Sequence, residues 1–259
     1  MQNIQLKNFN CHYKYEDFGH DQTLVLSNSL GTNLSMWNDN IDVLSRSFNI
    51  LRYDKRGHGK SSIHQDELTI AELAEDVIEL VDTLQLENVY FCGLSIGGLT
   101  GQWLAINRPD RFKKIIIANT AAKIGTIEGW ETRIKQVSEF GLESILEGTA
   151  SRWFTPEYRE KNPDKVENIL NDFKNNSLKG YTACCYAVGG ANLTNDLNKI
   201  EIPLLIIAGE KDEVTTVEDG KFIQERAKNA QLITFNAAHL SNMENPQEFS
   251  KQIIQFITN

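Results

Sequence analysis

The sequence predicts an α/β fold: a mostly parallel, twisted sheet with helices on both faces and a helical lid inserted between strands. Apolar runs of strand length alternate with amphipathic helical stretches at both ends of the chain, a pattern typical of parallel strands joined by right-handed crossovers. Between them, amphipathic helices follow one another without a convincing strand. We therefore expect residues 1–120 and 201–259 to form the sheet core and residues 121–200 to form the lid.

Composition and charge narrow the class of protein. With 259 residues, of which 41% are hydrophobic, the chain can bury a sizeable core. Its formal net charge of −9 argues against a nucleic acid or an anionic membrane as partner. The sequence has neither an apolar run of membrane-spanning length nor a signal-peptide pattern at its start, and its four cysteines lack metal-ligand or disulfide-framework spacing. We expect a cytoplasmic protein.

Apolar runs place the strands. The first two runs alternate in polarity, as partly exposed strands do. Later runs, such as residues 23–27, are continuously apolar and suit strands buried on both faces of a parallel sheet. The predicted strands are residues 4–9, 13–15, 23–27, 48–53, 89–92, 114–118, 203–208 and 231–235.

Helix signals fill the gaps between these strands. Trp37 and Leu44 share an apolar stripe, and Thr69 with Glu72 forms a capping box that opens a helix with a 3.6-residue apolar period. The last helix is expected to begin at Pro246, because proline is favoured at the first helical position, and to run to the C-terminus.

The strand at residues 89–92 leads directly into Gly-x-Ser-x-Gly, and helix-compatible residues follow. This is the sequence form of a nucleophile elbow, in which a strained turn raises the serine above the sheet. Such a turn needs neighbours without a β-carbon, and Gly93 and Gly97 meet that need. We predict that Ser95 is a nucleophile and that the backbone amide of Ile96 stabilises an oxyanion. The alternative is a glycine-rich turn with a bystander serine.

Chain order selects the partners of Ser95, because this type of site runs nucleophile, acid, histidine. Of the five histidines only His239 follows Ser95, and it lies between the last predicted strand and the last helix. Glu210 and Asp212 both follow the preceding strand. We favour Asp212, which would hold the tautomer of the imidazole and stabilise the imidazolium. The alternative is that Asp212 caps a helix beginning near Thr215.

The second oxyanion donor should come from the loop after the first buried parallel strand, residues 28–31, and we predict the amide of Leu30. We interpret Arg56 and His58 as parts of a structural turn over residues 54–61. The sequence contains no metal-ligand cluster, no phosphate-binding glycine loop and no dinucleotide fingerprint, so we expect neither a metal nor a cofactor.

The lid is expected to set specificity. Trp130 and Arg133 are three residues apart on a predicted helix and therefore share a face. An arginine beside an indole in an apolar pocket would bind a carboxylate, and an acidic substrate would need such a cation in a negatively charged protein. Lys123, just beyond the strand that ends at Ala118, is a second candidate. The alternative is a solvated arginine with the tryptophan in the lid core.

With these residues in hand, the chain resembles the α/β-hydrolases and, within them, the 3-oxoadipate enol-lactonases, over nearly its full length. The Asn-Ser-Leu-Gly loop, the Asn-Thr-Ala-Ala-Lys-Ile-Gly run and the Arg-Trp-Phe-Thr-Pro segment are the more distinctive parts of the likeness. Two departures, Ile96 where methionine is common and Thr216 where proline often follows the acid, remove no catalytic atom. The likeness rests on residues 26–32, 51–54, 56–59, 93–98, 118–125, 152–156 and 237–242.

The resemblance implies cofactor-free hydrolysis of a small anionic enol lactone to 3-oxoadipate, in the β-ketoadipate pathway of aromatic catabolism. Ser95 would attack the ring carbonyl while His239 takes its proton, and Trp153 would join Trp130 and Arg133 at the substrate. Two other readings stay open. One is a different hydrolase on the same fold, such as a carboxylesterase, a perhydrolase-type haloperoxidase or a C–C bond hydrolase, and the other is a non-catalytic ligand receptor.

Overall fold

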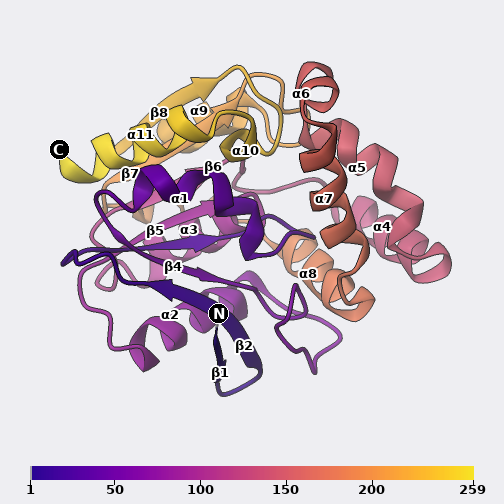
Figure 1. The fold of residues 1–259 in the computed structure, drawn as a ribbon, viewed down its shortest axis with the longest axis horizontal. Coiled ribbons are helices and arrows are strands. Elements are labelled where there is room, and N and C mark those ends of the chain that lie inside the picture. Colours follow the sequence, from indigo (N-terminus) through magenta and orange to yellow (C-terminus); the bar gives the residue numbers. More distant parts are fainter. Residues whose placement is uncertain (1) are drawn as a thin grey trace.

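The computed structural model describes residues 2–259 and builds them around one eight-stranded sheet (Figure 1). The strand order is β1-β2-β4-β3-β5-β6-β7-β8; the first two pairings are antiparallel and all the others are parallel. This confirms the predicted α/β fold with a mostly parallel sheet. The strands are β1 (Gln2–Gln5), β2 (Asn10–Glu16), β3 (Thr23–Ser27), β4 (Asn49–Tyr53), β5 (Val89–Leu94), β6 (Ile115–Ala118), β7 (Leu204–Gly209) and β8 (Ala230–Phe235).

Helices cover both faces of the sheet. Side chains of α1 and α11 pack on one face, whereas those of α2, α3 and α9 pack on the other. In residues 2–259 the α-helices are α1 (Asn38–Leu44), α2 (Ile70–Thr83), α3 (Ile96–Asn107), α4 (Ile127–Phe140), α5 (Leu146–Trp153), α6 (Pro156–Lys161), α7 (Pro163–Lys174), α8 (Leu178–Gly190), α9 (Val217–Gln224), α10 (Ser241–Glu244) and α11 (Pro246–Thr258).

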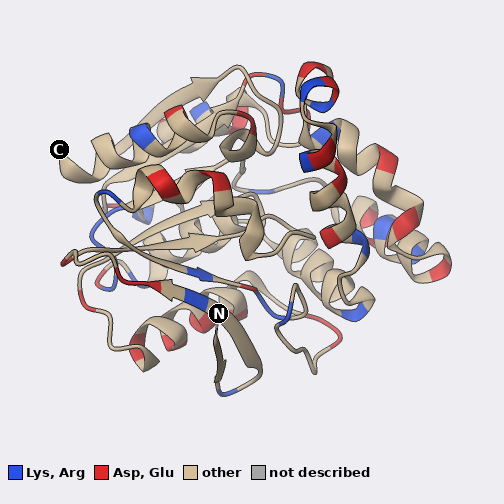
Figure 2. Ribbon diagram, viewed as in Figure 1, with Lys and Arg blue, Asp and Glu red and all other residues tan. Residues whose placement is uncertain are grey.

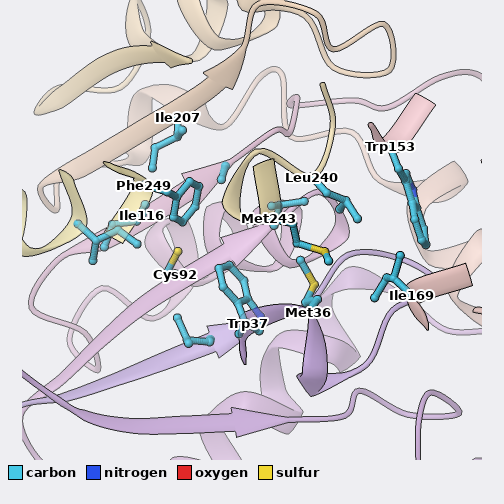
Figure 3. Close-up of a cluster of buried hydrophobic side chains, with 14 of the residues drawn as sticks. Met36, Trp37, Cys92, Ile116, Trp153, Ile169, Ile207, Leu240, Met243 and Phe249 are labelled. Atoms are coloured by element: carbon cyan, nitrogen blue, oxygen red, sulfur yellow. The ribbon is translucent and has the colours of Figure 1, made fainter. Parts of the chain in front are cut away.

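Alternation along the central strands divides the apolar side chains between the two faces. In β5, Tyr90 and Cys92 belong to the cluster under α1 and α11, whereas Phe91 belongs to the cluster under α2 and α3. Figure 3 shows the first cluster, in which Trp37, the last residue of a short 3₁₀ helix just before α1, and Phe249 of α11 lie over the sheet. A strand with both of its faces buried must be continuously apolar, which is why these runs were readable in the sequence.

Helices α4 to α8, which we call the cap helices, connect β6 to β7 and gather at one end of the sheet, on the right in Figure 1. Residues 121–200, all of them described, contain no strand. The apolar cluster of the sheet continues into these helices through Trp153 and Ile169 (Figure 3). Backbone hydrogen bonds join α5 to the loop after β8, from the Leu240 amide to the Trp153 carbonyl at 3.0 Å and from the His239 amide to the Arg152 carbonyl at 3.4 Å.

One local expectation was wrong, and one short helix was not predicted. The first strand is Gln2–Gln5 rather than residues 4–9, because the chain turns after Gln5, with a 3.0 Å bond from the Leu6 amide to the Phe9 carbonyl. Leu6 and Phe9 are apolar because they insert into the core from this turn. The short helix α10 also precedes the last helix. Among the helices of residues 2–259, none combines the length and the apolar character needed to cross a membrane.

Candidate active site

The candidate site lies where the parallel strands end. The register pairs Ser27 of β3 with Gly93 of β5, and Leu94 of β5 with Ala118 of β6, so the carboxyl ends of these strands are level. The loops that follow β3, β5, β6, β7 and β8 therefore meet at one edge of the sheet. This edge is the usual place for a ligand site in an open α/β sheet.

Ser95 lies in the tight turn between β5 and α3. Its backbone, with φ of 61° and ψ of −114°, is strained for a residue with a side chain. A bond of 2.9 Å from its amide to the Ala118 carbonyl holds the turn. A β-carbon on Gly93 would lie 2.0 Å from the Gly97 carbonyl oxygen, and one on Gly97 would lie 2.5 Å from that of Ser27. Both glycines are therefore needed for close backbone packing around the turn.

His239 and Asp212 are joined by a 2.8 Å bond from Nδ1 of the imidazole to Oδ2 of the carboxylate, and both side chains are buried. The alternative acid, Glu210, is exposed and instead accepts a hydrogen bond from Thr234. Because Nδ1 is engaged by Asp212, Nε2 is the ring nitrogen left to exchange a proton with a neighbour. Ser95 and His239 line the same cavity.

Besides His239, neighbouring residues donate hydrogen bonds to both oxygens of the Asp212 carboxylate. Its Oδ1 accepts the amides of Val214 and Thr215 at 2.8 and 3.1 Å, and its Oδ2 accepts the Thr215 hydroxyl at 2.8 Å and Asn119 Nδ2 at 2.9 Å. Burial alone would raise the pKa of Asp212, but the interaction with His239, helped by Asn119 and Thr215, lowers it to about 2. The site therefore keeps Asp212 ionised at neutral pH.

Asn119 was not singled out in the sequence. It is the first residue after β6, has a positive φ of 44°, and accepts a 2.5 Å hydrogen bond from the Ser241 hydroxyl while donating to Asp212. A left-handed asparagine directly after a buried strand is a recognisable turn signal. Its partners, however, come from two distant loops and could not be foreseen.

The amides of Leu30 and Ile96 belong to the loops after β3 and β5. Of residues 2–259, none accepts a hydrogen bond from either amide. Leu30 also lines the cavity with Ser95. His58 stabilises the loop after β3, because its Nε2 accepts a hydrogen bond from the Gly31 amide at 3.0 Å. Arg56 of the same turn donates to Asp76 at 2.6 Å, deep in the core.

The cavity has a volume of about 80 Å³ and is lined in part by residues of the cap helices α4, α5, α7 and α8. Three of the four predicted substrate contacts, Trp130, Arg133 and Trp153, line it, and the Trp130 indole also donates to the Ile124 carbonyl at 2.7 Å. The fourth, Lys123, is exposed and is not part of the lining. Its position after β6 turns it outward rather than over the site.

Arg152 lines the cavity as well, and it was missed as a site residue although its segment was noted. Burial and the neighbouring Arg133 lower its pKa. Figure 2 shows both acidic and basic residues on the cap helices. Within residues 2–259, however, neither Arg133 nor Arg152 has a carboxylate oxygen within 4.0 Å of its guanidinium group. Among the described residues, the one side-chain hydrogen bond made by either arginine runs from Arg133 to the Tyr181 hydroxyl at 3.4 Å. Two uncompensated guanidinium groups thus face one small cavity.

A larger groove, of about 1130 Å³, runs along α5, α6 and the loop after β7. It includes Arg152 and Asp212, but neither Ser95 nor His239, and its charged lining of both signs suits solvent. We assign the chemistry to the smaller cavity, because the nucleophile and the histidine meet there.

Comparisons with known proteins agree with this geometry. The sequence pattern of the alpha/beta hydrolase fold family matches residues 22–246. The chain is 46% identical over 241 residues to 3-oxoadipate enol-lactonase 2 of Acinetobacter baylyi, with 92% of this chain and 90% of that protein covered. It is 38% identical to 3-oxoadipate enol-lactonase 1 of the same organism, with 90% and 88% covered.

Among solved structures, the enol-lactonase from Burkholderia xenovorans superposes with a TM-score of 0.97 at 36% identity, with both chains fully covered. The expected fold and the resemblance are thereby confirmed. The chain belongs to the α/β-hydrolase fold family and, within it, to the 3-oxoadipate enol-lactonases.

Proposed function

We propose that this protein hydrolyses the lactone ester bond of 3-oxoadipate enol-lactone to give 3-oxoadipate, a step of the β-ketoadipate pathway. The observation that carries the proposal is a single cavity lined by Ser95, His239 and two arginines that have no carboxylate partner among the described residues. A nucleophile beside a pair of cations suits an ester that carries a carboxylate. The names of the relatives at 46% and 38% identity support the same substrate.

In the proposed reaction, His239 Nε2 accepts the proton of the Ser95 hydroxyl as Ser95 attacks the ring carbonyl. The amides of Leu30 and Ile96 donate to the oxyanion, and Asp212 stabilises the imidazolium. When the ring C–O bond breaks, the His239 imidazolium donates its proton to the leaving oxygen, and the resulting enol becomes a ketone, which makes this step irreversible. Water, deprotonated by His239, then releases the acyl group from Ser95.

The lactone carries an acetate arm, and we assign its carboxylate to Arg133 and Arg152. Guanidinium groups bind carboxylates with paired hydrogen bonds, and the effect is strongest where solvent is excluded. Trp130 and Trp153 supply the apolar walls of the cavity. On this proposal the cap helices are a lid that sets specificity, and the four free, buried cysteines support the expected cytoplasmic location.

The test is an ultraviolet assay that follows the loss of the enol lactone with the wild-type chain and with Ser95→Ala. We expect turnover by the wild type and none above background by the variant. A neutral p-nitrophenyl ester, assayed in parallel, distinguishes other hydrolases. Faster turnover of that ester than of the enol lactone would refute the substrate assignment, and turnover by Ser95→Ala would refute the nucleophile.

A further inference from the structure

Lys55 is a buried cation beside the loop after β3. It lies in the turn that follows β4, and its side chain is only 4% exposed. The ammonium donates a 2.7 Å hydrogen bond to the Ser29 carbonyl. In residues 2–259 no carboxylate oxygen lies within 4.0 Å of it. Burying an ammonium group without a paired carboxylate is unfavourable, so its position calls for an explanation.

The carbonyl that Lys55 binds belongs to the same peptide group as the Leu30 amide. Residues 2–259 contain no cis peptide bond, so this C=O and this N–H point in opposite directions. Lys55 therefore lies behind the peptide, and the N–H is directed away from it. Ser29, Leu30 and Ser95 all line the cavity, whereas Lys55 is not part of its lining. A cation on the oxygen of an amide makes its N–H a stronger donor, since hydrogen bonds in a chain polarise one another.

We propose that Lys55 is a positioning residue that fixes and polarises the Ser29–Leu30 peptide, so that the Leu30 amide stabilises the oxyanion more strongly. The proposal rests on the function proposed above, and it adds a charge that never contacts the substrate. The ammonium would act through one intervening peptide. Its contribution would be greatest when negative charge develops on the carbonyl oxygen of the substrate, that is, in the transition state.

The loop does not depend on Lys55 alone for its shape. The Ser29 carbonyl also accepts the Thr32 hydroxyl at 3.0 Å and the Thr32 amide at 3.3 Å. Asn176, at the start of the turn before α8, donates to the Gly31 carbonyl at 2.6 Å. Removing the ammonium therefore leaves the carbonyl paired, which makes the charge separable from the fold.

The surroundings of Lys55 give the proposal a pH signature. Burial lowers the pKa of Lys55 to about 8, against the opposing influence of Cys184 on α8 and of Asp54 in its own turn. Burial raises the pKa of the Cys184 thiol to about 12, and burial also raises the pKa of the Asp54 carboxyl. His58 is a further titratable neighbour, and its pKa is lowered by burial and by Lys55. We therefore expect kcat to fall as the pH rises through about 8.

Stability should move the other way. A lowered pKa means that the folded chain releases this proton before the unfolded chain does, so the contribution of Lys55 to stability rises with pH above about 8. A fall of kcat over this range without a matching loss of stability would thus separate polarisation from unfolding.

The experiment compares Lys55→Met with Lys60→Met, an exposed lysine of the same turn that serves as the matched control. We expect Lys55→Met to lower kcat for the enol lactone by about 3- to 30-fold, with KM within about twofold of the wild type. The alkaline fall of kcat near pH 8 should be absent from this variant. Lys60→Met should match the wild type in kcat, KM and pH profile.

Lys55→Gln, a neutral donor, covers the case in which Lys55→Met does not fold; it too should lack the alkaline fall of kcat. An unchanged kcat in a folded Lys55→Met would overturn the proposal, and so would an alkaline fall that persists in either variant. A drop in kcat matched by an equal rise in KM would also overturn it, because that pattern indicates general damage to the site. Ser95→Ala distinguishes failure of the proposed function from failure of the Lys55 proposal. If Ser95→Ala still turns over the lactone, the proposed function is refuted, whatever the result for Lys55.

Discussion

Replacing Arg133 with methionine should weaken turnover of the anionic enol lactone far more than turnover of a neutral ester. Arg133 is half-buried on α4, lines the cavity with Ser95, and has no carboxylate partner among the described residues. Its guanidinium is therefore available to the carboxylate of a substrate. Methionine keeps much of the apolar stem and removes only the charge and the donors.

The size of the effect follows from the burial of the group. A hydrogen bond to a charged partner contributes about 1.5–3 kcal/mol, which corresponds to a loss of about 10- to 150-fold in kcat/KM. Arg152 lies beside Arg133 and lines the same cavity, so the remaining guanidinium should hold the loss near the lower end of this range. The double variant with Arg152→Met should then lose more than the sum of the two single effects on a free-energy scale, because the second cation compensates only while it is present.

The assay measures kcat/KM for the enol lactone and for p-nitrophenyl acetate with each variant. Lys135→Met, an exposed lysine on the same helix, is the matched control and should behave as the wild type. Equal losses on both substrates would refute the role of Arg133 in carboxylate binding. A selective loss in Arg152→Met alone would transfer that role to Arg152.

Three further predictions concern the frame of the site. Asn119→Ala removes a hydrogen-bond donor to Asp212 and leaves the Ser241 hydroxyl without its acceptor. We therefore expect kcat to fall about tenfold in steady-state kinetics and the free energy of unfolding to fall by about 1–3 kcal/mol in urea unfolding. Gly97→Ala would place a β-carbon 2.5 Å from a backbone oxygen, so we expect the free energy of unfolding to fall by more than about 3 kcal/mol, or the variant not to fold. The control Gly190→Ala has open space around the added β-carbon and should unfold at the wild-type temperature or above. The pKa of Asp212 is lowered from its ordinary value of 3.8 to about 2, so its contribution to stability is present above about pH 4 and is lost as the pH falls toward 2. The difference in unfolding free energy between the wild type and Asp212→Asn should therefore shrink by about 1 kcal/mol between pH 6 and pH 3, and a constant difference would contradict the lowered pKa.

Local patterns were sufficient for the frame of the molecule. Strands buried on both faces must be continuously apolar, so β3 and β5 to β7 could be read from short windows of sequence. The nucleophile elbow could also be predicted from a short window, because crowding by backbone oxygens restricts two of its positions to glycine. His239 followed from chain order alone, because no other histidine comes after Ser95.

Contacts between distant segments could not be read in this way. Near the N-terminus, alternating polarity suggested one strand over residues 4–9, but a turn buries Leu6 and Phe9 instead, and a period of two does not distinguish these outcomes. Lys123 and Arg152 are both cations of the segment that connects β6 to β7. Only the packing of the cap helices decides that Arg152 faces the cavity and Lys123 faces solvent.

The sequence by itself determined the α/β frame, the strained serine and the order in which acid and histidine follow it, because these depend on neighbours along the chain. The tertiary structure alone decided which polar and charged groups meet: Asn119 with Asp212, Lys55 with the Ser29 carbonyl, and the two cap arginines at one cavity. The physical reason is that electrostatic interactions depend on distance and burial. Both quantities are set by how the loops after separate strands pack together, and neither is encoded in any short stretch of residues.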